Sequence, residues 1–154
     1  MEPMEMPKPG PAHQQLAKLA GEWTGDEKIH PAPWDPAGGT AVGKCSNRVV
    51  LDGFAVMQEY EQRRGGTVNF RGHGVFWIDA ESGKPRLHWW DTMGGTVAAF
   101  TGDWQGDELV MDTVTPMGHM RCRFAIRGNS YTFKMEASPD GKQFIPSMEG
   151  SYRK

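Results

Sequence analysis

Glycine and proline punctuate this 154-residue chain at short, regular intervals, and this spacing limits the folds that it can adopt. Twenty glycines and eleven prolines divide the sequence into segments of roughly strand length, about 6–12 residues each. Asp52-Gly53, Gly65-Gly66 and Gly94-Gly95 are typical turn sequences, and Asp52-Gly53 predicts a two-residue hairpin turn. The chain is therefore expected to consist of many short strands joined by tight turns.

The pattern predicts one helix and a succession of strands. The helix is expected over 13–20, after a flexible, Pro-rich leader at 1–12. Because no helix separates any two strands, the strands must pair antiparallel, and a meander this long must close to protect its edges. We therefore predict an all-β fold, a closed antiparallel up-and-down β-barrel of about ten strands with one short N-terminal helix, in a single domain at 13–154. The strands are predicted at 22–30, 40–51, 54–62, 68–79, 86–91, 96–103, 108–115, 119–126, 131–138 and 145–152.

Charge and composition exclude several classes of partner. Seventeen Lys and Arg against nineteen Asp and Glu leave a net charge of −2, which argues against nucleic acid as a partner. No apolar run is long enough to span a membrane, and the first thirteen residues lack the apolar core of a secretory signal. Cys45 and Cys122 are far apart and form no C-x-x-C motif, which favours two reduced thiols in a cytoplasmic protein.

A Trp at the start of the first predicted strand and an Arg at the end of the last form a recognisable pair. Gly21-Glu22-Trp23 and Arg153 resemble the signature of calycins, the lipocalins and fatty-acid-binding proteins among them. A bacterial family of uncharacterised calycin-like proteins is resembled by five segments together: KLAGEWTGDEKIHPAPWDPAGGTA, LDGFAVMQEYEQ, FRGHGVFWID, LHWWDTMG and the ending SPDGKQFIPSMEGSYRK. The resemblance implies that Trp23 plugs the closed end of the barrel and that the Arg153 guanidinium lies across its ring.

The opening segment is also similar to that of nitrobindin-like haem barrels. Leu19, Gly21, Trp23 and Gly25 match their L-x-G-x-W-x-G pattern. Those barrels hold haem through a His in the last strand, where this chain has Ile-Pro-Ser-Met at 145–148. A lone Met is a poor anchor for ferric iron, so this departure from the haem-barrel pattern disfavours haem, and no cofactor is expected.

A hairpin centred near 81–84 brings several candidate ligand contacts together. If Asp79 pairs with Arg86, the side chains of His73, Trp77, His88 and Trp90 share one sheet face, with Phe100 beside them on the next strand. Such a face is typical of an apolar cavity wall with a few polar groups. The opposite face is also apolar, so the pattern does not decide which face is inside. The surplus apolar face could belong to a homodimer contact.

Other candidate contacts are flexible or lie in a loop. Met111 and Met120 are two of ten methionines, a residue type that adapts to loosely specified apolar ligands as well as filling gaps in a core. Trp34 lies in a Pro-stiffened loop after the first strand, where it is expected to act as a lid over the barrel mouth.

Three functions follow as hypotheses. The first is binding of a small, largely apolar molecule in the barrel cavity. The second is an isomerase or hydrolase that uses one pocket histidine, although the chain has no nucleophile motif and no histidine pair spaced for a metal ion, so a catalytic role is disfavoured. The third is a homodimeric interaction module.

Overall fold

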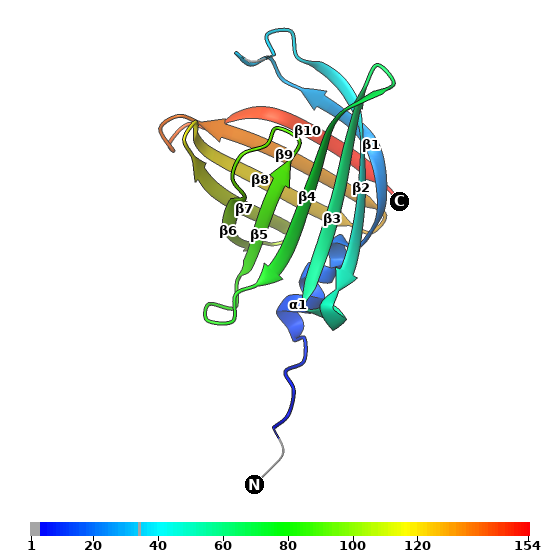
Figure 1. Ribbon diagram of the computed structural model, residues 1–154, viewed down its shortest axis with the longest axis vertical. Helices are drawn as coiled ribbons and strands as arrows, with labels where there is room; N and C mark the ends of the chain where they lie inside the picture. The colour runs from blue at the N-terminus through cyan, green and yellow to red at the C-terminus, as the bar shows by residue number, and fades with distance from the viewer. Residues whose placement is uncertain (1–3, 34) are drawn as a thin grey trace.

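The computed structural model describes residues 4–33 and 35–154, and in them the strands form one closed antiparallel barrel (Figure 1). Each strand pairs with the next along the chain, and β10 pairs with β1 to close the ring. The predicted all-β barrel is therefore confirmed. The helices are α1 (Pro11–Leu16), η1 (Ala17–Leu19) and η2 (Leu51–Gly53). The strands are β1 (Gly21–Ile29), β2 (Gly39–Val50), β3 (Ala55–Arg64), β4 (Thr67–Ile78), β5 (Pro85–Asp91), β6 (Ala98–Gln105), β7 (Glu108–Thr115), β8 (Gly118–Arg127), β9 (Ser130–Ser138) and β10 (Ile145–Arg153).

Every predicted strand is present, and each begins and ends within two residues of its predicted limits. The turn between β2 and β3 differs from its prediction. The last pair of the β2–β3 hairpin is Val50 with Ala55, so the connection holds four residues instead of two. Leu51, Asp52 and Gly53 all have positive φ angles there, which makes a left-handed loop in place of the expected two-residue turn.

The N-terminal helix begins at Pro11, two residues earlier than predicted. Proline suits the first position of a helix because its missing N–H would have no partner there and its φ angle is already helical. The helix carries Leu16, and the 3₁₀ turn that follows carries Leu19, and both side chains are fully buried. These two leucines close one end of the barrel, where Figure 1 shows the helix below the strands.

The barrel has a closed end and an open end. Inward-facing side chains near the helix, such as those of Trp23, Phe76 and Phe124, are almost fully buried. Toward the other end, inward-facing Phe70, Trp89 and others are only half-buried and so remain accessible to solvent. The long β1–β2 connection lies at this open end (Figure 1). None of the helices in the described ranges is long and apolar enough to cross a membrane.

Trp23 plugs the closed end of the barrel as expected, but the cation that covers its ring is not the expected one. The Trp23 side chain is 1% exposed, and its indole N–H donates to the Leu19 carbonyl at 3.0 Å. The Nζ of Lys154 lies 5.1 Å from the centre of the ring. The prediction that Arg153 performs this role is wrong, because Arg153 pairs with Thr24 and shares its exposed, outward orientation. Lys154, one residue later, reaches the ring instead.

Both thiols are predicted to be inert in the folded protein. Cys45 and Cys122 are free and buried, and burial raises the pKa of both, that of Cys122 to about 12. At pH 8 the thiolate fraction of Cys122 is then about one in 10⁴. We expect no reaction with a thiol-specific chromogenic disulfide at pH 8 in buffer and two thiols titrated in denaturant. Rapid labelling of the native protein would contradict this burial.

Candidate functional site

The four aromatic and histidine residues predicted as a cavity wall lie on the outer surface of the barrel. In the β4–β5 hairpin Trp77 pairs with Arg86 and His73 with Trp90, a register two residues away from the expected one. An even shift leaves His73, Trp77, His88 and Trp90 on one shared face, as predicted. The alternate positions, Phe76 and Leu87 among them, fill the core, whereas Trp90 is 40% exposed. The predicted place of these four residues in the cavity wall is therefore wrong.

These outer residues contact one another and the neighbouring strand. The His73 ring lies 4.8 Å from that of Trp90, and its Nδ1 is 2.5 Å from Oε1 of Glu59 on β3. The rings of Trp77 and His88 are 5.6 Å apart. The homodimer contact that this face suggested stays a prediction.

The remaining predicted contacts divide between the interior and the undescribed part of the chain. Phe100 pairs with Leu87 and points inward, so it lies on the opposite face from His88 instead of beside it. Met111 is fully buried in the core, and Met120 packs against that core from a half-buried position. Trp34, the expected lid residue, lies outside the described residues.

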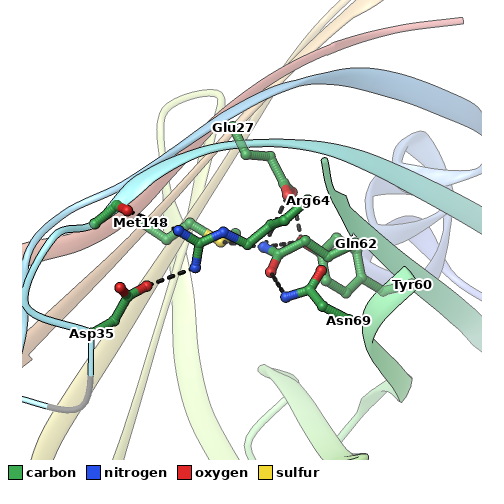
Figure 2. Close-up of polar contacts among 8 residues, drawn as sticks. Glu27, Asp35, Tyr60, Gln62, Arg64, Asn69 and Met148 are labelled. Carbon is green, nitrogen blue, oxygen red and sulfur yellow. Dashed lines mark hydrogen bonds and ion pairs between the residues drawn. The ribbon is translucent and has the colours of Figure 1, made fainter. Parts of the chain in front are cut away.

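A buried carboxyl group is the centre of the polar part of the interior. Glu27 on β1 points inward and is 2% exposed. The hydroxyl groups of Tyr60 on β3 (2.6 Å) and of Tyr152 on β10 both donate to its Oε2. The Nε2 of Gln62 donates to its Oε1 at 3.0 Å (Figure 2). Two strands, β3 and β10, thus supply three donors to one carboxyl group on β1.

Glycines on the flanking strands make room for this carboxyl group. In the sheet, Glu27 on β1 lies between Gly150 on β10 and Ala41 on β2, with Gly43 two residues further along β2. A Cβ atom at Gly43 would overlap the Glu27 carboxylate, and one at Gly150 would overlap the Tyr152 hydroxyl. The space that holds the carboxyl group and its phenol donor therefore depends on the absence of these two side chains.

Gln62 connects the buried carboxyl group to the mouth of the barrel. Its Nε2 also lies 3.1 Å from the Tyr60 hydroxyl and 3.5 Å from Sδ of Met148. Its Oε1 accepts a hydrogen bond of 3.0 Å from Asn69, an exposed residue of β4. Figure 2 shows this chain of contacts from Asn69 through Gln62 to Glu27.

Aromatic rings form the wall beside the polar cluster. The ring of Tyr60 lies 6.0 Å from that of Phe70 and 6.3 Å from that of Trp89. The Trp89 indole lies against Gly72 of the neighbouring strand, where a Cβ atom would overlap it. Its N–H donates to Oδ2 of Asp91 at 2.8 Å, which places a second inward acid near the mouth.

The loop between β1 and β2 is tied to the rim of the mouth. Arg64, at the end of β3, donates to Oδ2 of Asp35 at 2.6 Å and to the Gly38 carbonyl at 2.8 Å (Figure 2). These contacts hold the described parts of the loop beside the open end.

Electrostatics keep the two phenols in their donor form. Burial, reinforced by the nearby Glu27 carboxyl, raises the pKa of Tyr60 and of Tyr152 far above the usual value for tyrosine. Both hydroxyl groups are therefore protonated at neutral pH and available to donate to the carboxyl group.

No motif in the sequence indicated the residues of this polar cluster, Glu27, Tyr60, Gln62 and Tyr152. One signal for Glu27 was available: it is four residues after the plug residue Trp23 on a strand, so both side chains must share a face. A charged residue on the face of a buried Trp indicates a buried charge. Nothing in the spacing predicted its partners, which lie 33, 35 and 125 residues away.

The histidines do not enter the interior. His30 contacts Oε2 of Glu149 at 2.9 Å, on the outer side of the β1–β10 pair, and His13 packs against Phe54 from the N-terminal helix. His119 lines an outer groove of about 490 Å³ that runs over β6, β7 and β8. In that groove Arg121 pairs with Asp112 at 2.6 Å and covers the Phe144 ring. A catalytic histidine inside the barrel, as one hypothesis required, is thus not found among the described residues.

Comparisons with other proteins match this chain to a family and to a fold. Residues 8–154 match the model of a family described as a protein of unknown function (DUF1579). No curated protein matches the sequence. The crystal structure of Rv2717c from M. tuberculosis is similar in fold, with a TM-score of 0.71 and 14% identity over 94% of this chain and 98% of that one.

Proposed function

Since the chain belongs to the DUF1579 family, a family without an assigned function, we propose from the site itself that it binds a small, largely apolar molecule in the open half of its barrel. The observation that carries the proposal is the asymmetry of the interior. Inward-facing side chains are sealed at the helix end but remain accessible at the other, where aromatic and methionine side chains surround a few polar groups. An apolar wall with a few placed polar groups is typical of ligand sites.

The proposal includes a calycin-like origin for the barrel. Support comes from the Trp23 plug, the covering cation at the C-terminus and the single helix that closes one end. In such an arrangement the closed end provides stability and the open end provides the site. Binding is favoured over catalysis because the described inner face carries no histidine, and neither of its two buried cysteines has a base within hydrogen-bond distance.

Binding of the neutral dye Nile red tests this function. We expect saturable fluorescence enhancement with one site per chain. Ala98 on β6 faces inward beside Trp89, so Ala98→Trp would fill the mouth and weaken dye binding about tenfold or more, a loss of about 1.4 kcal/mol. Ala99→Trp is the matched control, because Ala99 is the next residue on β6 and its side chain is exposed on the outer face of the barrel.

The two variants separate an interior site from a surface site. Loss of binding in Ala98→Trp alone supports the barrel interior. Loss in Ala99→Trp alone would move the site to the outer surface and contradict the proposal. A wild-type protein that gives no saturable enhancement would contradict it as well.

A further inference from the structure

We infer that the molecule taken up by the barrel is a small organic cation, an ammonium group on an apolar body, and that its charge pairs with Glu27. This inference rests on the proposed function and adds the chemical class of the ligand.

The inner face of the barrel carries an excess of negative charge. Inward positions of the described strands include two acids, Glu27 and Asp91, and none of the inward residues between the closed end and the rim is Lys, Arg or His. Arg64 lies at the rim, where it is already paired with Asp35. At the opposite end, Lys154 covers Trp23. The interior therefore has no cation of its own to balance Glu27.

The partners of Glu27 are all neutral. They are two phenol hydroxyl groups and one amide, which satisfy three acceptor sites of the carboxylate but leave its charge uncompensated. A carboxylate can accept about four hydrogen bonds, so one site is free. Buried charges in proteins are normally paired. A bound ammonium group would supply both the missing charge and the missing donor.

Acceptors also outnumber donors around Gln62. Three acceptors lie within hydrogen-bond distance of its Nε2: Oε1 of Glu27, the Tyr60 hydroxyl oxygen and Sδ of Met148. An amide nitrogen has two hydrogens, so it cannot serve all three at once. An ammonium group has three hydrogens. A bound cation that contacts the same acceptors would therefore supply the hydrogen-bond donor that Gln62 cannot.

The aromatic wall suits the same ligand. Tyr60 donates to Glu27 and lies about 6 Å from the rings of Phe70 and Trp89, which remain half-buried toward the mouth. Faces of Trp and Tyr attract cations and also accept apolar chains. Asp91, which accepts a hydrogen bond from Trp89, adds negative charge near the mouth, where a ligand would enter the barrel.

Three ligands that share a ten-carbon chain test the inference. Decylammonium, decanol and decanoate are compared at pH 7 for displacement of Nile red, below the micelle concentrations of the two charged ligands and below the solubility limit of decanol. We expect decylammonium to displace the dye at about tenfold lower concentration than decanol, because a hydrogen bond between two charged groups is stronger than one to a neutral hydroxyl group. Decanoate should be the weakest of the three, because its charge has the same sign as that of Glu27.

Glu27→Gln should abolish this preference, since it keeps the shape of the side chain and removes its charge. Glu149→Gln is the matched control, because Glu149 is an acid on the outer side of the adjoining strand and should leave the preference unchanged. Equal displacement by decylammonium and decanol in the wild type overturns the inference by itself, even if Glu27→Gln does not fold. A preference that survives Glu27→Gln also overturns it.

The failure of the inference is distinguishable from that of the proposed function. If Nile red binds and all three ligands displace it equally, the barrel binds apolar molecules without regard to their charge. That result overturns the inference but supports the proposed function. A protein that binds neither the dye nor any of the three ligands contradicts the proposed function itself.

Discussion

Replacing Trp23 by alanine is expected to lower the free energy of unfolding by about 3–5 kcal/mol, the usual cost of deleting a large buried aromatic side chain. Trp23 is almost fully buried, donates to the Leu19 carbonyl and packs with its ring 5.4 Å from that of Tyr131. Its removal opens the closed end and leaves Asn47, which donates at 2.9 Å, as the remaining side-chain donor to the Leu19 carbonyl. Denaturation in urea, followed by circular dichroism, measures the change.

Two further variants separate the causes of this loss. Trp23→Phe keeps a ring in the plug but loses the indole donor, so we expect an intermediate loss of stability. Trp90→Ala removes a Trp that is 40% exposed on the outer face, and we expect it to cost much less. Equal losses at Trp23 and Trp90 would show that the interior and exterior faces have been assigned the wrong way round.

Gly25→Ala is the second substitution with a large expected effect, about 3 kcal/mol of lost stability. A Cβ atom at Gly25 would overlap the backbone carbonyl of Ser151, which belongs to the strand that closes the barrel. Backbone atoms cannot rotate away as a flexible side chain can, so β1 and β10 must separate locally. Thermal and urea denaturation of the variant measure the cost.

Whether Gly25→Ala lowers or raises the free energy of unfolding tests how closely β1 and β10 pack. Glycine in a strand is unfavourable, so local propensity alone predicts that alanine at this position stabilises the protein. Thr24→Ala, on the exposed neighbouring residue, provides the control and should change stability little. A Gly25→Ala variant as stable as the wild type would show that the β1–β10 seam is looser than the structure indicates.

The positions of the strands were predictable because turn chemistry is local. Gly and Pro mark where the chain reverses, and each predicted strand lies within two residues of its observed limits. The left-handed loop at Leu51 and Asp52 shows the limit of this reasoning. Two non-glycine residues there adopt positive φ angles, against their local preference.

The sequence also predicted which side chains of the β4–β5 hairpin lie on the same face of the sheet, but it did not predict which face points into the barrel. His73, Trp77, His88 and Trp90 share a face even though the expected register was two residues off, because side chains alternate along a strand. Both faces of this hairpin are rich in aromatic residues, so hydrophobicity could not decide between them. Closure of the barrel decided it.

What the sequence alone determined about this protein is its set of strands, their antiparallel order and the role of Trp23 as a plug. Only the tertiary structure placed Glu27, Tyr60, Gln62 and Tyr152 around one another, on strands β1, β3 and β10. Local spacing determines secondary structure through backbone preferences. A site built across a closed sheet depends instead on the register and shear of all its strands together, which no segment of the chain specifies by itself.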